Sequence, residues 1–328
     1  MRKLDHYWYS DNWVSTLLRP LSWCFRGMVA IRRWLYKKSL LESVKLPVPV
    51  IIVGNISVGG TGKTPLVIAL VTLLKKHGYH PGVITRGYGG DKQAKPVLVT
   101  SDSDPYAVSD EAVLLAQRTQ SPVVASPNRI ASSKMLLAKG CDIIISDDGL
   151  QHYRLQRDVE IAVIDATRGF GNSYCLPAGP LREPQGRLNS VDLVVMNGDE
   201  SKRNDDFMMQ MHSHPPIKLV NGEESSVDDF AGSKVHAIAA VGNPQRFFDY
   251  LKLLGMTVIE HEFPDHHRYV TSEIEFDDSY PVFMTEKDAV KCRKLVDSEK
   301  YHYIAIDAEL DTRFEPSIIN LLAKTKTV

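Results

Sequence analysis

A glycine-rich turn before Lys63 and Thr64 is the first feature of the sequence that could do chemistry. "VIIVGN" has the composition of a buried strand, and "KTPLVIALVTLLKK" that of a helix. In such a turn, backbone N–H groups converge on phosphate oxygens, the lysine adds charge and the hydroxyl holds Mg²⁺. The turn therefore predicts a nucleotide-phosphate site, the P-loop, made of Ser57, Val58, Gly59, Gly60, Thr61, Gly62, Lys63 and Thr64.

The P-loop departs from the common G-x-x-x-x-G-K-[ST] pattern, because Ser57 stands where the first glycine is expected. A G-G-x-G-K-[ST] form occurs in ATPases that position membranes and chromosomes, and these usually carry a lysine where this chain has Val58. The alternative is a glycine turn that binds no ligand. The co-occurrence of strand, glycines, Lys-Thr pair and helix favours phosphate binding.

Two carboxylates, Asp147 and Asp148, follow a second apolar strand, "CDIIIS". Strands of a parallel sheet present their carboxyl ends to the ligand, and a carboxylate about 80 residues after a P-loop is typical of a magnesium anchor. The alternative is an aspartate pair that only caps a turn. The presence of the lysine loop favours a metal site at Asp147 and Asp148.

Further polar residues are expected at the same edge. Arg86 and Tyr88 follow a strand in "TRGYGG", and the rigid loop "LPAGPLREP" presents Arg182 and Glu183. Asp110 begins a helix, where a carboxylate is also favoured by the helix dipole alone.

The stretch "HEFPDHHRY" contains three histidines but does not fit a helical zinc motif. Asp265 stands where H-E-x-x-H requires histidine, and Pro264 would break the helix. A loop bearing His266 and His267 suits proton transfer or a phosphate contact, and the alternative is a pair of surface histidines.

The elements that must position these residues form an alternating pattern. Short β-branched runs alternate with helical periodicity, which predicts an α/β fold with a P-loop NTPase-like parallel sheet and crossover helices. The expected strands are 48–54, 80–86, 121–126, 141–146, 159–165 and 191–197, and the expected helices are 63–77, 110–120 and 129–139.

A polar, proline-marked stretch from Asn197 to Pro216 predicts a domain boundary near residue 215. Further strands at 235–242, 256–263, 281–287 and 302–308, with a helix at 244–254, predict a smaller second α/β domain. The expected organisation is an N-terminal membrane-associated helical segment over 1–40, a P-loop kinase core over 41–215 and the second domain over 216–328.

The N-terminus has an unusual composition. All four tryptophans lie within the first 34 residues, and residues 12–41 contain six basic and no acidic side chains. A helix over 21–38, with Pro20 in its first turn, would set Arg26, Arg33 and Lys37 along one line. The opposite face would carry Leu21, Cys24, Met28, Ile31 and Leu35. The run is too interrupted to span a bilayer and lacks the form of a signal peptide. An amphipathic helix on an anionic membrane and a surface helix packed on its own protein both fit.

Overall composition narrows the function classes. The 328 residues carry 39 Lys+Arg against 40 Asp+Glu, a net charge of -1 that argues against a nucleic-acid partner. The four widely spaced cysteines, Cys24, Cys141, Cys175 and Cys292, fit reduced thiols, and we expect them in the core.

Taken together, "GNISVGGTGKTP", "TRGYGG", "SDEA", "PNR", "SDDGLQH", "LPAGPLREP", "FPDHH" and "TEKDAVK" resemble the tetraacyldisaccharide 4'-kinase family of lipid A assembly. The motifs run in the same order from about residue 54 to residue 291. The resemblance also covers the basic N-terminal helix, which in that family lies on the inner membrane.

The resemblance implies transfer of the ATP γ-phosphate to the 4'-hydroxyl of an acylated glucosamine disaccharide 1-phosphate, on the cytoplasmic face of the inner membrane. We expect the protein to act as a monomer. The resemblance assigns Lys63 and Thr64 to phosphates and Mg²⁺, Asp147 and Asp148 to the metal, and Asp110 with His266 to activation of the hydroxyl. His267 stays an alternative partner of Asp110. The resemblance also places five residues facing the substrate: Arg86, Tyr88, Arg129, Gln151 and His152. Arg182 and Glu183 are further site residues.

Two other functions remain open from the sequence. The unusual P-loop and amphipathic helix also suit a non-enzymatic ATPase switch that cycles on and off a membrane, although Val58 and the "DDGLQH" cluster argue against it. A cytosolic small-molecule kinase, with its N-terminal helix packed on the core, is the third possibility.

Overall fold

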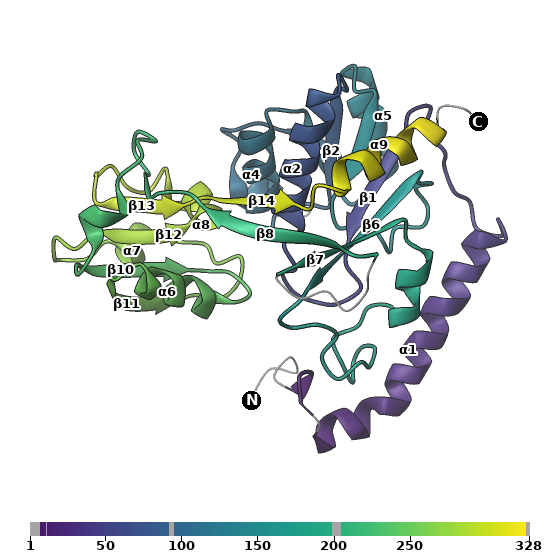
Figure 1. The fold of residues 1–328 in the computed structure, drawn as a ribbon, viewed down its shortest axis with the longest axis horizontal. Helices are drawn as coiled ribbons and strands as arrows, with labels where there is room; N and C mark the ends of the chain where they lie inside the picture. The colour runs from purple at the N-terminus through teal and green to yellow at the C-terminus, as the bar shows by residue number, and fades with distance from the viewer. Residues whose placement is uncertain (1–6, 11, 92–94, 199–204, 326–328) are drawn as a thin grey trace.

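Two lobes joined by a pair of strands make up the protein (Figure 1). The computed structural model describes residues 7–10, 12–91, 95–198 and 205–325. The larger lobe, here called the core, has a nine-stranded sheet in the order β14-β8-β7-β6-β1-β5-β2-β4-β3. The smaller, here called the second lobe, has a five-stranded sheet in the order β11-β10-β12-β13-β9.

The core sheet is parallel except at its two edges, where β3 and β14 run antiparallel to their neighbours. All five residues of β1 are buried, as expected for a parallel sheet with both faces covered. The core strands are β1 Val50–Gly54, β2 Pro81–Thr85, β3 Val97–Val99, β4 Val123–Ala125, β5 Ile143–Ser146, β6 Val159–Asp165, β7 Leu193–Asn197, β8 Phe207–Ser213 and β14 Ile306–Leu310.

Helices cover both faces of the core sheet. On one face, α2 (Lys63–Lys76), α4 (Asp110–Thr119) and α9 (Phe314–Thr325) bury apolar side chains against the strands. The opposite face packs on α5 (Arg129–Ala138) and on the 3₁₀ turn η2 (Gln185–Ser190). Leu66, Leu70 and Leu74 recur at helical spacing on α2 and are fully buried, so this apolar stripe fixes the helix that carries the P-loop lysine.

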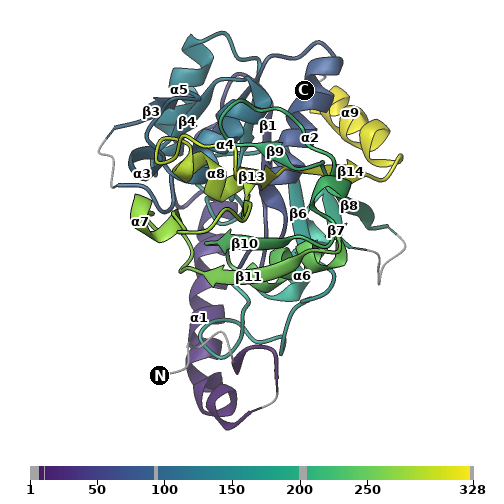
Figure 2. The ribbon, with the colours of Figure 1, turned by 90° about the vertical axis from the view of Figure 1, so that its left-hand side faces the viewer.

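The second lobe contains the other elements that reach the site. Its strands are β9 Ile217–Lys218, β10 Lys234–Ala239, β11 Thr257–Glu262, β12 Val282–Thr285 and β13 Tyr301–Ile304. Its helices are α6 Pro244–Leu253, α7 Thr271–Ile274 and α8 Glu286–Cys292, and η3 covers Val227–Phe230. Arg118 of α4 donates to both carboxylate oxygens of Glu286 of α8 at 2.7 Å, so the two lobes are joined where these helices lie side by side (Figure 2).

The α/β fold with a large parallel sheet is confirmed, and each expected strand overlaps one observed strand except for the last, which overlaps two. The run 302–308 forms two strands, β13 in the second lobe and β14 in the core. The expected boundary stretch 197–216 contains β8, while its residues 199–204 lie outside the described residues. Because β14 and α9 return to the core, the second sheet takes its strands from residues 217–304, and the expected extent of the second domain, 216–328, is too long.

The N-terminal helix α1 spans Trp13–Lys37 and is longer than predicted. It begins where the Asn12 side chain accepts from the Ser15 N–H at 2.9 Å, so Pro20 lies inside the helix rather than in its first turn. Pro20 is exposed, so the carbonyl left without an amide partner can meet water. Figure 1 shows α1 along the side of the core that faces away from the second lobe.

One narrow face of α1 packs on the core through small and polar side chains. Ser22 Oγ donates to the Cys175 carbonyl at 2.7 Å, and the Arg33 guanidinium donates to Ser190 Oγ at 2.7 Å. Cys24 is exposed on this helix, which corrects the expectation that all four cysteines are buried. Surface packing is therefore part of the role of α1, and its exposed face is a separate feature.

Candidate active site

The P-loop joins β1 to α2 through two glycines with positive φ, +112° at Gly59 and +90° at Gly62. A side chain at Gly62 would be strained by this φ and would also meet neighbours, since an added Cβ would lie 2.7 Å from Asn197 Nδ2. Asn197, at the end of β7, donates to the Thr61 carbonyl at 3.2 Å. The loop is thus held by its neighbours while its helix end stays available to an anion.

Residue 57 does not need to be glycine. Ser57 forms an isolated antiparallel bridge with Leu181, and the Val58 N–H donates to the Pro180 carbonyl at 2.8 Å. These contacts hold an extended backbone that any residue adopts. The "LPAGPLREP" loop therefore braces the start of the P-loop, which explains the departure from the common pattern.

Asp147 and Asp148 follow β5, at the same sheet edge as the P-loop. Asp147 is 3% exposed, and its Oδ1 is buried with no hydrogen-bond partner in the described part of the chain. Burial, and next the charge of Glu111, raise the pKa of Asp147 to about 7. An orphaned buried carboxylate oxygen beside a phosphate loop fits a divalent cation, which would satisfy that oxygen and keep the group ionised.

Asp148 holds the P-loop lysine. Its carboxylate lies 3.5 Å from Lys63 Nζ and 3.1 Å from an Arg182 guanidinium nitrogen. Burial acts to raise the pKa of Asp148, but the charges of Lys63 and Arg182 outweigh it, and the pKa falls below its usual value. Asp148 thus keeps Lys63 near the expected phosphate site, and a bound phosphate would replace Asp148 as the ion-pair partner of Lys63.

Arg129 lies beneath this pair of aspartates rather than at the surface. Its guanidinium donates to Ser146 Oγ, to the Asp147 carbonyl at 2.8 Å and to the Asp148 carbonyl at 2.7 Å. Arg129 is 3% exposed, and burial lowers its pKa to about 10, so it stays charged. The expectation that Arg129 faces the disaccharide is therefore wrong, because its donors hold the turn that carries the carboxylates.

Replacing Arg129 with methionine should lower the free energy of unfolding by about 2 kcal/mol or more, because buried carbonyl groups lose charged donors. Chemical denaturation measures the change. Lys134→Met provides the control, since Lys134 is exposed on the same helix. Equal stability of the two variants would contradict a structural role for Arg129.

Asp110 and His266 form a carboxylate–imidazole pair across the two lobes. His266 Nδ1 lies 3.2 and 3.3 Å from the Asp110 oxygens. Burial acts to raise the pKa of Asp110, but the hydrogen bond to His266 and nearby positive charges outweigh it and lower the pKa. His267 instead lies 3.0 Å from Glu273 and stacks on Phe263, so the geometry selects His266 as the partner of Asp110.

The "TRGYGG" loop supports His266 from the core side. A Cβ at Gly89 would lie 2.6 Å from His266 Nδ1, so glycine is what allows the imidazole to approach. The Tyr88 ring meets the imidazole edge-on at 5.3 Å and is 66% exposed. Arg86 is exposed on the same loop. Both side chains are open to a ligand.

Gln151 and His152, both half-buried, follow the strand-end aspartates, whereas Glu183 is buried. Gln151 Nε2 donates to Glu183 Oε1 at 2.8 Å and to the Asn55 carbonyl at 3.1 Å. Glu183 is 1% exposed and also accepts from Tyr153, so it positions Gln151 rather than facing a ligand as expected. Burial lowers the pKa of His152 to about 4, which leaves a neutral imidazole whose Nδ1 lacks a partner among the described residues.

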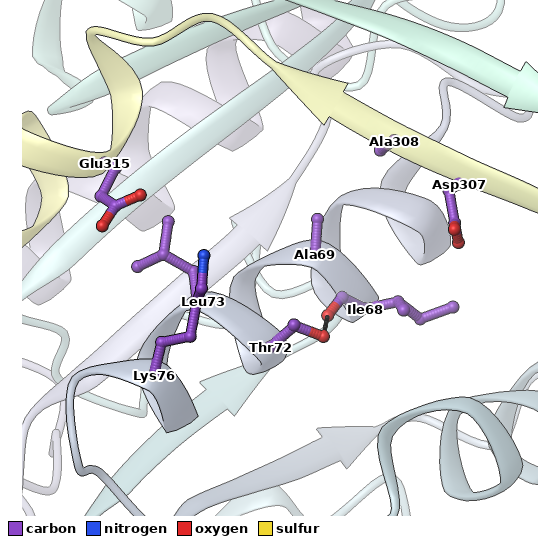
Figure 3. A pocket seen from close by; sticks show the side chains of 8 residues that line it. All are labelled: Ile68, Ala69, Thr72, Leu73, Lys76, Asp307, Ala308 and Glu315. Atoms are coloured by element: carbon purple, nitrogen blue, oxygen red, sulfur yellow. Dashed lines mark hydrogen bonds between the residues drawn. The ribbon is translucent and has the colours of Figure 1, made fainter.

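Two half-open pockets lie apart from these residues. One pocket of 280 Å³ lies between α2, β14 and α9, lined by Ile68, Ala69, Thr72, Leu73, Lys76, Asp307, Ala308 and Glu315 (Figure 3). A larger one of 790 Å³ is lined in part by Phe170, Leu188 and Met196. Neither is lined by a predicted site residue, so the candidate site is the edge where the carboxyl ends of the core strands meet the second lobe.

Comparison with known proteins gives a consistent result. The family model described as tetraacyldisaccharide-1-P 4'-kinase matches residues 14–324. The chain belongs to this family. A tetraacyldisaccharide 4'-kinase of Nitrosococcus oceani is 48% identical over 317 residues, covering 96% of this chain and 93% of the relative. One of Pasteurella multocida is 48% identical over 308 residues, covering 93% and 94%.

The fold of this kinase family is also known from a solved structure. The LpxK protein of Aquifex aeolicus in complex with ATP matches with a TM-score of 0.80 and 29% identity, covering 94% of this chain and 99% of that one. The resemblance seen in the sequence is thus confirmed, and the kinase prediction is supported over the membrane-cycling ATPase switch.

Two lysines of α8, Lys287 and Lys291, also lie at the site, although they were not predicted as site residues. Both lie within 4 Å of Asp110 oxygens. The "TEKDAVK" motif contains both lysines, and their i, i+4 spacing places them on one helix face. The local sequence does not predict which carboxylate this helix face contacts, because that depends on how the two lobes pack together.

Proposed function

We propose that this protein transfers the γ-phosphate of Mg-ATP to the 4'-hydroxyl of tetraacyldisaccharide 1-phosphate, as a monomer at the cytoplasmic face of the inner membrane. The proposal rests chiefly on the Asp110–His266 pair at the sheet edge of the P-loop. The pair lies at the sheet edge of the metal-site carboxylates: Gly89, in the loop after β2, packs against His266, and β2 pairs with β5, which ends just before Asp147. A base and a phosphate site side by side are what phosphoryl transfer to an alcohol requires.

The nucleotide would bind with its phosphates on the backbone of residues 57–64. Lys63 would move its ammonium from Asp148 to the β- and γ-phosphates. Thr64, Asp147 and Asp148 are the residues that would hold Mg²⁺, and the ion would neutralise charge on the phosphate oxygens. Arg182, paired with Asp148, adds a further positive charge at this edge.

The acceptor hydroxyl would be activated by Asp110. A carboxylate oxygen takes the proton as the 4'-oxygen bonds to phosphorus, while the bond from the γ-phosphorus to the bridging oxygen breaks and ADP leaves. His266 holds the carboxylate by its hydrogen bond and shares the proton that arrives. Arg86, Tyr88, Gln151 and His152 would contact the disaccharide head, with Arg129 and Glu183 fixing the elements behind it.

Nucleotide consumption tests this function. Purified protein with Mg-ATP should release ADP at a high rate when dispersed tetraacyldisaccharide 1-phosphate is present and at a far lower rate without it. ADP release that is equal in both cases would contradict a kinase and favour an ATPase. A small-molecule kinase would be indicated by turnover of a deacylated disaccharide at an equal rate.

Membrane association is proposed for the exposed face of α1. Within the described residues, no helix is both long enough and apolar enough to cross a bilayer. Large apolar side chains that are more than half exposed nonetheless run along α1: Trp13, Leu17, Leu21, Trp23, Met28, Ile31 and Trp34. Such a face, with basic residues beside it, suits the interface of an anionic membrane. A substrate with four acyl chains stays in that membrane, since each buried methylene contributes about 0.8 kcal/mol.

Leu21→Glu should weaken binding to anionic vesicles by about tenfold or more, because it removes apolar contact and adds repulsion. Vesicle sedimentation measures the partition. Leu253→Glu makes the same substitution at an 82% exposed leucine of α6 in the second lobe and should leave binding unchanged. Equal effects of the two variants would exclude α1 as the membrane contact.

A further inference from the structure

Helix α8 of the second lobe brings two ammonium groups to a carboxylate of the core. Lys287 Nζ lies 3.9 Å from Asp110 Oδ1, and Lys291 Nζ lies 3.7 Å from Asp110 Oδ2. His266 Nδ1 approaches the same carboxylate from the loop after β11. Asp110, which opens α4 in the core, is therefore surrounded by three cationic or titratable groups, and all three belong to the second lobe.

Lys291 is the more buried of the two lysines, with a side chain 1% exposed. It lies 2.8 Å from Asp288 and 4.9 Å from the centre of the Tyr269 ring. Asp288 is already bonded by neutral donors, because it accepts from the Thr285 and Tyr269 hydroxyls and from the Ala240 N–H. The Lys291 charge is thus shared between a fixed partner in its own lobe and the carboxylate of the other lobe.

Lys287 connects the same carboxylate to the protein surface. Its ammonium lies 3.2 Å from both Glu111 and Asp265, and its side chain is 16% exposed. The charged and titratable groups around the Asp110–His266 pair are therefore Lys287, Lys291, Glu111, Asp265, Asp288, Tyr88 and Tyr269. Of these, the two lysines are the groups whose charge opposes that of Asp110.

We propose that Lys287 and Lys291 are positioning residues for phosphoryl transfer, which hold Asp110 ionised and oriented when α8 of the second lobe lies against α4. This inference rests on the proposed role of Asp110 as the base. Both lobes then contribute to the base. Helix α4 supplies the carboxylate, and α8 supplies the positive charges that keep this carboxylate able to accept a proton. Neither lysine needs to touch the substrate.

The lysine charges should affect the pH dependence of the reaction in one direction. A cation within about 4–6 Å of a carboxylate stabilises its ionised form, and it also disfavours protonation of a nearby imidazole. Both effects lower the pH at which the Asp110–His266 pair takes up a proton, and a pair in hydrogen-bond contact titrates as a unit. Removal of a lysine charge should therefore move the acidic limb of the rate profile to higher pH.

The test compares pH profiles of kcat/KM for the lipid acceptor in the full-length protein. Lys287→Met and Lys291→Met should each shift the acidic limb upward by about one pH unit, with the KM for ATP unchanged. Lys287→Arg keeps the charge and should restore the wild-type limb. If circular dichroism shows that Lys291→Met is unfolded, Lys287→Met and Lys287→Arg still test the inference, because Lys287 is more exposed.

Lys294→Met is the matched control. Lys294 follows α8 and also reaches across to the core, but its ammonium donates to the Asp102 carbonyl at 3.2 Å rather than to Asp110. The limb of this variant should stay at the wild-type pH. Suppose that Asp110→Asn inactivates the enzyme but Lys287→Met leaves the acidic limb at the wild-type pH. This result would overturn the inference and leave the proposed function intact. Normal activity in Asp110→Asn would overturn both.

Discussion

Replacing Lys63 with alanine should lower kcat by at least about 10²–10³-fold, because the P-loop lysine is proposed to neutralise charge on the transferred phosphate and alanine cannot. Lys63 begins α2 and is held next to the phosphate site by Asp148, 3.5 Å away. Single-turnover transfer from labelled ATP measures the chemical step directly. Because α2 is anchored by buried leucines, the variant should remain folded.

Lys76→Ala is the control for this substitution. Lys76 is at the opposite end of the same helix from Lys63, where it lines the smaller pocket (Figure 3). It should retain wild-type turnover. A Lys63→Ala enzyme that transfers phosphate at a rate close to that of Lys76→Ala would remove the P-loop from the mechanism.

Asp110→Asn should lower the rate of the chemical step by about 10²-fold or more, because an amide cannot accept the proton of the acceptor hydroxyl. The fall should appear in kcat, with the KM for ATP nearly unchanged, since Asp110 contacts His266 and the α8 lysines rather than the P-loop. Rapid-quench kinetics separates this step from product release.

The same substitution at another helix start provides the comparison. Asp104 caps the short helix α3 (Pro105–Val108) by accepting from the Tyr106 N–H at 3.0 Å, and asparagine can form the same bond. Asp104→Asn should therefore keep full activity. A loss of activity shared equally by the two variants would indicate that Asp110 serves as a helix-terminal carboxylate and leave the base to be found elsewhere.

Local patterns in the sequence predicted much of this site. The P-loop and the strand-end aspartates each involve a strand and a turn whose geometry is set by neighbouring residues. The Asp110–His266 pair was expected only from the family resemblance, because the two residues lie 156 positions apart and belong to different lobes. Tertiary contacts decided the rest. Arg129 and Glu183 are polar, and the sequence does not show that each is buried beneath the site. Lys287 and Lys291 meet Asp110 because two lobes dock, and Ser57 replaces glycine because a loop more than 100 residues away braces it.

The same limits apply to the fold. Strands β1 to β7 were predictable from apolar runs, except the short β3 at the sheet edge. The return of β14 to the core was missed because a single run, 302–308, supplies a strand to each sheet. Helix α1 was placed too late in the chain because Pro20 is usually a helix start, whereas here Asn12 caps the helix and the proline lies on its exposed side.

The structure of the reaction product tests the central claim most directly. Wild-type protein, Mg-ATP and tetraacyldisaccharide 1-phosphate are incubated, and the lipid is isolated and analysed by phosphorus and proton NMR. Our account predicts a lipid that keeps its 1-phosphate and carries a new phosphate monoester on the 4'-oxygen. A new phosphate at another position, or recovery of the lipid unchanged while ATP is hydrolysed, would contradict it.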